Sequence, residues 1–136
     1  MILMKSKVHI QKLENYALDK VESFIRKALS VIDEKESLFS AGQKILLKPN
    51  LLRGFSPEYC VTTHPVVVEA MCRVLKDFSV GQITISDSPA LGSLEAVASK
   101  AGYDLLKKKY GVKIVPLTNP IPFETEENIP HLKIAG

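Results

Sequence analysis

Short apolar runs alternate with segments of helical periodicity along this chain, and no other feature of the sequence restricts the fold as strongly. Residues 44–47 form a compact apolar run without polar alternation, which is typical of a strand buried in a parallel sheet. Residues 83–85 and 112–115 are expected as further strands. Apolar residues spaced three and four apart predict helices over residues 65–78, 94–101 and 104–110. Strands that alternate with helices pair in parallel through right-handed crossovers, so the sequence predicts an α/β domain.

The expected architecture is three-layered, with a mostly parallel sheet of about four strands and flanking helices, Rossmann-like or flavodoxin-like. The fourth strand is residues 8–10, ahead of a helix that Asn15 caps and that runs to Ile32. Residues 51–62 contain glycine and proline without a clear period, and we expect a long loop there.

The pattern lapses after residue 117, where prolines and an acidic stretch at residues 124–127 suggest extended segments. We therefore assign residues 1–117 to the α/β domain. Residues 118–136 are either an extended segment of the same domain or the start of a further portion, with a possible edge hairpin around Asn128.

Composition points to one soluble globular domain, because the 136 residues are 46% apolar and 24% charged. The net charge of +3 is spread along the chain, and the one basic run, residues 107–109, fits a solvated helix face. Nucleic-acid binding is unsupported without a basic stripe and interleaved aromatic residues. The apolar start ends at Lys5 and no run is long enough for a membrane span, so we expect a cytoplasmic protein.

The two cysteines, Cys60 and Cys72, are not arranged as a CxxC pair, and alone they could ligate neither zinc nor a cubane cluster. No metal site is therefore expected. Cys60 precedes His64 by four residues, which would permit a thiolate–imidazole pair, although a lone buried cysteine is favoured. The chain also has no Walker loop, no G-x-G-x-x-G, no H-E-x-x-H and no G-x-S-x-G motif.

Polar residues cluster after the strands predicted at residues 44–47 and 83–85, where an open parallel sheet binds its ligands. In the first cluster, Lys48 supplies a charge and Asn50 a donor and acceptor, which suit a phosphate or carboxylate. The alternative is that Lys48 extends to solvent while Asn50 makes a local turn.

The second cluster offers the hydroxyls of Thr62 and Thr63 at a helix start, and His64 could transfer a proton near neutral pH. The alternative is an ordinary N-cap with a partly exposed imidazole.

In the third cluster, Asp87 could bind a ligand hydroxyl, hold a cation or orient His64. Ser88 and the amides of Gly92 and Ser93 could hold an anion. The alternative is a turn built from Asp, Ser and Pro.

These clusters occur in three linked motifs, residues 45–52, residues 61–65, and residues 86–89 with 92–93. Together they resemble the uncharacterised family called domain of unknown function three-six-two. The resemblance implies a longer protein, often with a ferredoxin-like domain whose cysteines bind a cluster, so that members are described as iron-sulfur cluster-binding proteins. This chain resembles the N-terminal portion of such a protein. It departs from the family at Ala90, where glycine is common.

The leading hypothesis is a ligand-binding domain of an iron-sulfur-associated redox family that holds a small anionic or carbonyl-bearing ligand. Lys48 would neutralise the charge of the ligand, Asn50 would contact the ligand, and His64 would act as acid or base. Asp87 would orient His64 or bind the ligand. Because this sequence lacks the cluster cysteines of the family, no cofactor is expected within this chain. The resemblance implies a 4Fe-4S cluster only in a missing domain or partner. The alternatives are a non-catalytic module that docks a ferredoxin-like or other cluster-bearing partner, and an incomplete fragment. The reaction, if any, is left open.

Overall fold

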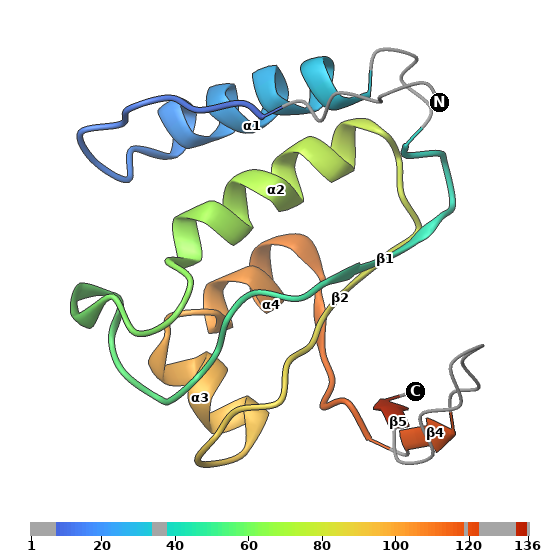
Figure 1. Ribbon diagram of the computed structural model, residues 1–136. Coiled ribbons are helices and arrows are strands. Elements are labelled where there is room, and N and C mark those ends of the chain that lie inside the picture. The colour runs from blue at the N-terminus through green and yellow to red at the C-terminus, as the bar shows by residue number, and fades with distance from the viewer. Residues whose placement is uncertain (1–7, 34–37, 119, 123–132, 136) are drawn as a thin grey trace, which may run out of the picture.

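Three parallel strands form the central sheet of the computed structural model, which describes residues 8–33, 38–118, 120–122 and 133–135 (Figure 1). The strands are β1 (Lys44–Leu47), β2 (Gln82–Ile85) and β3 (Lys113–Ile114), paired in the order β1-β2-β3. Leu47 lies opposite Ile85, which lies opposite Ile114. The predicted parallel α/β arrangement is confirmed for these strands, although the strand predicted at 112–115 is shorter.

The prediction of a strand at residues 8–10 is wrong. Residues 8–10 have no strand structure, and Val8 and Ile10 are 76% and 86% exposed. A run of three residues has an apolar pattern too short to specify a strand.

The helices follow the predicted periodicity closely. They are α1 (Leu18–Ile32), α2 (Pro65–Asp77), α3 (Leu94–Lys100) and α4 (Asp104–Tyr110), with one 3-10 turn, η1 (Pro57–Tyr59). Asn15 is not the cap of α1, because its side-chain oxygen accepts from the amide of Ala17, the actual N-cap residue, at 3.1 Å. Asp104 lies in the first turn of α4, and its carboxylate accepts a hydrogen bond from the Ser99 hydroxyl.

The core lies on one face of the sheet. Ile83 and Ile85 of β2 are buried with apolar residues of α2, α3 and α4, and Ile45 and Leu47 pack against them. The alternate residues point the other way, and Leu46 is 57% exposed. α1 packs against α2, on its side away from the strands (Figure 1).

The predicted three layers are therefore not present in the described residues, where helices cover a single face. The strand order explains this, because right-handed crossovers that proceed in one direction along a sheet place their helices on one side. A Rossmann-like sheet covers both faces only because its strand order reverses.

Two further strands, β4 (Pro120–Pro122) and β5 (Lys133–Ala135), pair antiparallel in a separate two-stranded sheet at the lower right of Figure 1. They do not pair with the edge of the parallel sheet. Asn128, the predicted centre of the hairpin, lies outside the described residues. The division between residues 1–117 and 118–136 stays a prediction.

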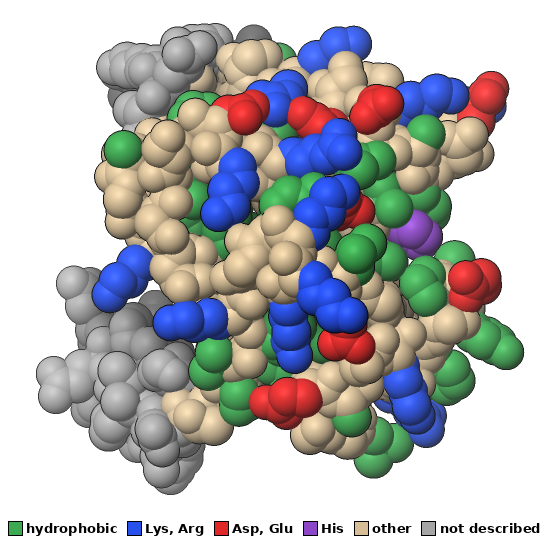
Figure 2. All heavy atoms as spheres, turned by 180° about the vertical axis from the view of Figure 1, so that it is seen from behind, with side chains coloured by type: hydrophobic (Ala, Val, Ile, Leu, Met, Phe, Trp, Pro, Cys, Tyr) green, Lys and Arg blue, Asp and Glu red, His purple; other side chains and the backbone are tan. Residues whose placement is uncertain are grey.

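The basic run at residues 107–109 is exposed in α4, as predicted, and Lys109 pairs with Glu69 at 2.6 Å. Viewed from behind, Lys and Arg side chains are interspersed with Asp and Glu over the surface (Figure 2). This surface is typical of solvated helix faces.

Candidate functional site

The carboxyl ends of β1 and β2 bring two predicted site residues into contact. The Lys48 ammonium lies 2.6 Å from one carboxylate oxygen of Asp87. Asp87 is buried at 6% exposure, whereas the Lys48 side chain is 61% exposed. Parallel strands end at the same edge of a sheet, which is why residues 39 positions apart meet here.

The Asp87 carboxylate also fixes the loop after β1. Its second oxygen accepts from the Leu51 amide at 2.7 Å, and the Ser88 amide donates to the carboxylate as well. Burial alone would raise the pKa of Asp87, but the hydrogen bonds from Lys48 and from these amides outweigh burial and lower the pKa below its usual value. Asp87 is therefore ionised at neutral pH and connects the two loops.

The loop after β1 closes on the start of α2 through the threonine pair. The Asn50 amide donates to the Thr63 hydroxyl at 2.9 Å, and the Thr63 amide donates to the Asn50 carbonyl at 2.8 Å. The buried Tyr103 hydroxyl donates to the Thr63 carbonyl at 2.9 Å. The segment predicted as a long loop is thus tied at both ends, and Leu51 and Thr62 form an isolated antiparallel bridge.

Thr62 and Asn50 carry the unused polar groups of this region. Thr62 is buried, and its hydroxyl has no hydrogen-bond partner in the described structure. Asn50 is exposed, and its side-chain amide makes no hydrogen bond within the described part of the chain.

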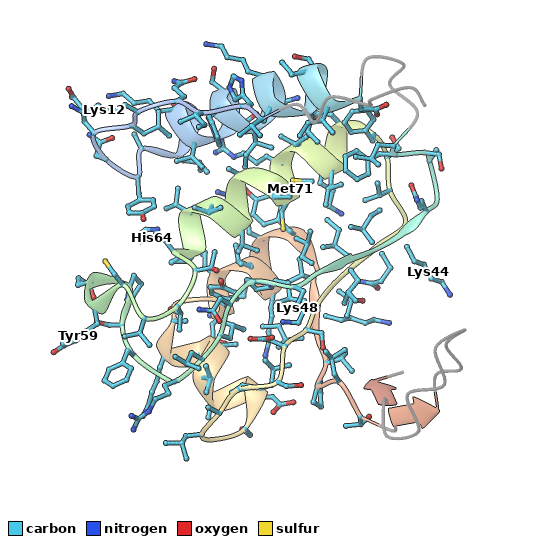
Figure 3. All side chains as sticks on the ribbon, in the orientation of Figure 1. Lys12, Lys44, Lys48, Tyr59, His64 and Met71 are labelled. Carbon is cyan, nitrogen blue, oxygen red and sulfur yellow. The ribbon has the colours of Figure 1, made fainter. Side chains whose placement is uncertain are left out.

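His64 is not part of this group of contacts. Its ring stacks on Tyr16, with centroids 3.8 Å apart, and its Nδ1 accepts from the Val66 amide at 3.3 Å as the N-cap of α2. Figure 3 shows His64 at the start of α2, apart from Lys48 at the end of β1. Burial lowers the pKa of His64 despite the opposing effect of Glu58. Asp87 does not orient this imidazole, and a role for His64 in proton transfer stays a prediction.

The residues of the third predicted cluster do not act together in the structure. The Ser93 hydroxyl accepts from the Ala96 amide at 3.2 Å and caps α3, while Ser88 is exposed beside Asp87. Gly92 has a φ of +89°, a left-handed conformation that favours glycine. Gly92 lines a groove with Arg53 and Lys100, two residues that the sequence patterns did not single out.

The cysteines do not fit an iron-sulfur cluster, which four thiolates hold in its common form. Cys72 is buried in the core, where burial and Glu69 raise the pKa of its thiol to about 11. Cys60 is exposed, so its predicted burial is wrong, and its thiol contacts the Glu58 carbonyl. The described residues contain no group of three or more His, Cys, Asp or Glu side chains that could hold a metal ion.

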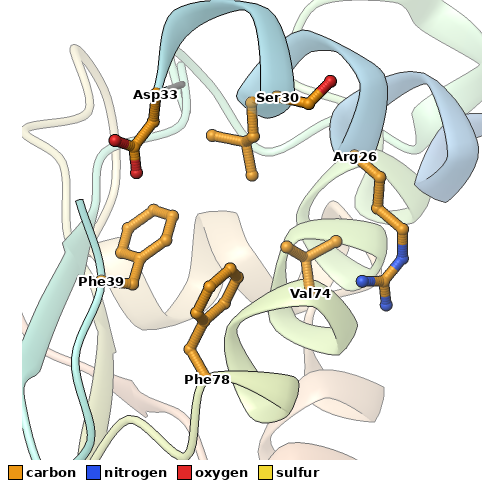
Figure 4. Close-up of a pocket in the computed structure, with 7 residues that line it drawn as sticks. Arg26, Ser30, Asp33, Phe39, Val74 and Phe78 are labelled. Atoms are coloured by element: carbon orange, nitrogen blue, oxygen red, sulfur yellow. The ribbon is translucent and has the colours of Figure 1, made fainter. Parts of the chain in front are cut away.

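A separate small pocket of about 140 Å³ lies between α1 and α2 (Figure 4). Phe39 and Phe78 line it, with ring centroids 5.3 Å apart, beside Val74. It contains none of the predicted site residues, and its lining is that of a packing defect between two helices.

Comparison with known proteins agrees with the motifs at the sheet edge. Residues 45–136 match the family described as domain of unknown function (DUF362). This chain belongs to the DUF362 family. It is also similar to a thylakoid-associated protein of Synechocystis sp. (strain PCC 6803), with 27% identity over 132 residues.

This DUF362 chain spans 41% of the length of that relative, and the alignment covers 97% of the chain. No solved structure matches the chain. Within the residues that the structure describes, no helix has the length and apolar character needed to cross a membrane.

Proposed function

We propose that this DUF362 chain binds a small anionic ligand at the edge where β1 and β2 end. Lys48 and Asn50 would contact the ligand, and Asp87 would position Lys48. The observation that carries the proposal is the 2.6 Å contact between the exposed ammonium of Lys48 and the buried carboxylate of Asp87. A buried acceptor holds the lysine at the sheet edge while its outer part stays open to solvent.

The ammonium of lysine has three donors, and the contact with Asp87 uses one of them. The remaining donors and the free amide of Asn50 are the groups available to a phosphate or carboxylate. Asp87 offsets most of the charge of Lys48, so we expect weak binding by this chain alone, with a Kd of about 1 mM, or roughly −4 kcal/mol.

We also propose that the chain is part of an iron-sulfur-associated redox protein. The cluster would belong to a cysteine-rich domain or partner outside this chain, because the two cysteines present do not form a site for it. The name of the Synechocystis relative states a location and no reaction, so the redox role is drawn from what the family resemblance of the three motifs implies.

A second candidate function is docking of a cluster-bearing partner or domain. The observation that favours it is the uncovered face of the parallel sheet, where Leu46 is 57% exposed. Parallel sheets are almost always covered on both faces, so a further layer is expected on this one.

Titration with inorganic phosphate, followed by the amide resonances of a ¹⁵N-labelled chain, tests the proposed anion site. We expect saturable shifts at Asn50, Leu51 and Ser88, because these amides surround the Lys48–Asp87 contact. Lys48→Met should abolish the shifts, since it keeps the aliphatic stem and removes the donors.

The matched control is Lys44→Met, because Lys44 lies at the opposite end of β1 (Figure 3). This variant should bind phosphate as the native chain does. Equal titration curves for Lys48→Met and the native chain would show that the anion does not bind at Lys48.

A further inference from the structure

A groove of about 370 Å³ lies beside the Lys48–Asp87 site, between the loop after β1, the loop after β2, and α3. Its volume is within the range of small-molecule pockets. The lining residues that matter for recognition are Arg53, Phe55, Leu91, Gly92, Val97 and Lys100.

The charge of the groove is uniformly positive. Arg53 and Lys100 are its charged lining residues, and no carboxylate from the described part of the chain lines it. The other two arginines each pair with two carboxylates, Arg26 with Glu22 and Asp77, and Arg73 with Glu22 and Asp19. Arg53 has no carboxylate partner among the described residues, so its guanidinium is available to an anion.

One wall of the groove is suited to a flat ring. The guanidinium carbon of Arg53 lies 5.5 Å from the centroid of the Phe55 ring, and Phe55 in turn contacts Tyr59. A guanidinium is planar and weakly hydrated, so it stacks on aromatic faces. The exposed Leu91 and the buried Val97 supply apolar surface.

The walls of the groove are held in place before any ligand arrives. The Ala90 amide donates to the Leu52 carbonyl at 3.0 Å, which joins the two loops. Gly54 packs so closely on α3 that an added Cβ would lie 2.9 Å from the Cδ of Lys100. The loop therefore lies directly against α3, and a preformed site loses less entropy on binding.

We infer that this groove is a separate binding site for an organic anion that carries a planar ring. Arg53 and Lys100 would bind the anionic group, and the Arg53–Phe55 pair with Leu91 would contact the ring. The site shares no side chain with Lys48, Asn50 or Asp87, so it does not depend on the function proposed for them.

Adenosine 5′-monophosphate is a suitable probe, with adenosine and inorganic phosphate as its two halves. We expect the monophosphate to shift the amide resonances of Gly54, Gly92 and Ala96 and to bind at least tenfold more tightly than either half. The double variant Arg53→Gln/Lys100→Gln should weaken binding of the monophosphate by tenfold or more.

Two control variants distinguish binding in this groove from binding at the sheet edge and from a general loss of positive charge. Lys108→Gln removes an exposed lysine of α4 and should bind the monophosphate as the native chain does. Lys48→Met removes the cation of the sheet-edge site, and the amides of Gly54, Gly92 and Ala96 should still shift in it, whereas any shifts at the sheet edge should disappear. The inference is overturned if the double variant binds normally, if the monophosphate does not bind, or if either half binds as tightly. Loss of binding in Lys48→Met would assign the probe to the sheet-edge site and would also overturn it.

Discussion

At the scale of single residues, Asp87 is the side chain on which the candidate site depends. Its buried carboxylate accepts from one ammonium and from amides of the two loops that surround the sheet edge. Removal of such an acceptor leaves buried donors unpaired, which costs more than the hydrogen bonds contribute.

The Lys48–Asp87 contact predicts a pH-dependent effect of Lys48→Met on stability. The pKa of Asp87 is below its ordinary value of 3.8 in the folded chain, so the contact stabilises the fold above that value and is lost as pH falls through the lowered pKa. We expect the substitution to reduce the free energy of unfolding by about 1 kcal/mol at neutral pH, a modest value because Lys48 is largely exposed.

Urea denaturation at neutral pH and at a series of pH values below 3.8 measures this effect, because the carboxyl of the folded chain becomes protonated as pH falls through its lowered pKa. The difference between the native chain and Lys48→Met should shrink at the lower pH. A difference that stays constant across this range would mean that the lysine stabilises the fold by packing alone.

The sequence was sufficient to place Lys48 and Asp87 at one sheet edge, because both follow predicted parallel strands. It could not reveal the Leu51 amide, since a backbone donor has no sequence signature. It also could not reveal that Tyr16 stacks on His64, which is a contact between segments 48 residues apart (64 − 16). The sequence patterns did not single out Arg53, because only the structure shows that no carboxylate of the described residues pairs with it.

At the scale of elements, the sequence predicted helix ends correctly where the residues at the end themselves determine it. Pro65 begins α2 and Gly111 ends α4 with a φ of +65°, both as helix-end preferences require. The cap of α1 was misassigned because the asparagine side chain prefers a hydrogen bond two residues on, which competes with capping.

Gly81 directly precedes β2, and we expect it to be the least replaceable of the described glycines. A Cβ at this position would lie 2.6 Å from the Gly42 carbonyl oxygen, and both glycines hydrogen-bond to the facing segment. Gly81→Ala should therefore reduce the free energy of unfolding by about 2 kcal/mol or more, because backbone must move.

Gly111→Ala is the matched comparison, measured by the same denaturation experiment. Nothing lies within 4 Å of the added Cβ, and only the left-handed φ is unfavourable, at a cost of about 1 kcal/mol. If Gly111→Ala were the more destabilising of the two, the close approach of Gly81 to Gly42 would be refuted.

At the scale of the whole molecule, the described residues give the sheet one packed face and one open face. The apolar run at residues 44–47 was predicted to be buried on both sides, yet Leu46 is exposed and Leu47 packs against the core. Sequence pattern reports that a residue suits burial, but only the strand order and the connecting helices determine which face is covered here.

Because neighbouring residues of β1 lie on different faces of the sheet, we expect their substitutions to differ strongly in their effect on stability. Leu46→Glu should change the free energy of unfolding by less than about 0.5 kcal/mol, because its side chain already meets solvent. Leu47→Glu should cost about 3 kcal/mol or more, since it places a carboxylate against the core. Chemical denaturation of both variants provides the measurement.

The Leu46→Glu variant also tests docking on the open face. A ferredoxin-like domain that covers this face should bind the native chain and fail to bind Leu46→Glu. Unchanged affinity for the variant would exclude the open face as the docking surface.

The strand order has a consequence for how the chain assembles. Each strand of the parallel sheet pairs with the next one along the sequence, so every crossover is local. Pairing of consecutive strands closes shorter loops than pairing that skips a strand would, which lowers the entropy lost before the contacts form. During synthesis, at about 5–20 residues per second, β1 and β2 can pair before β3 has left the ribosome. The Lys48–Asp87 contact, which needs only those two strands, can then be among the first long-range interactions to form.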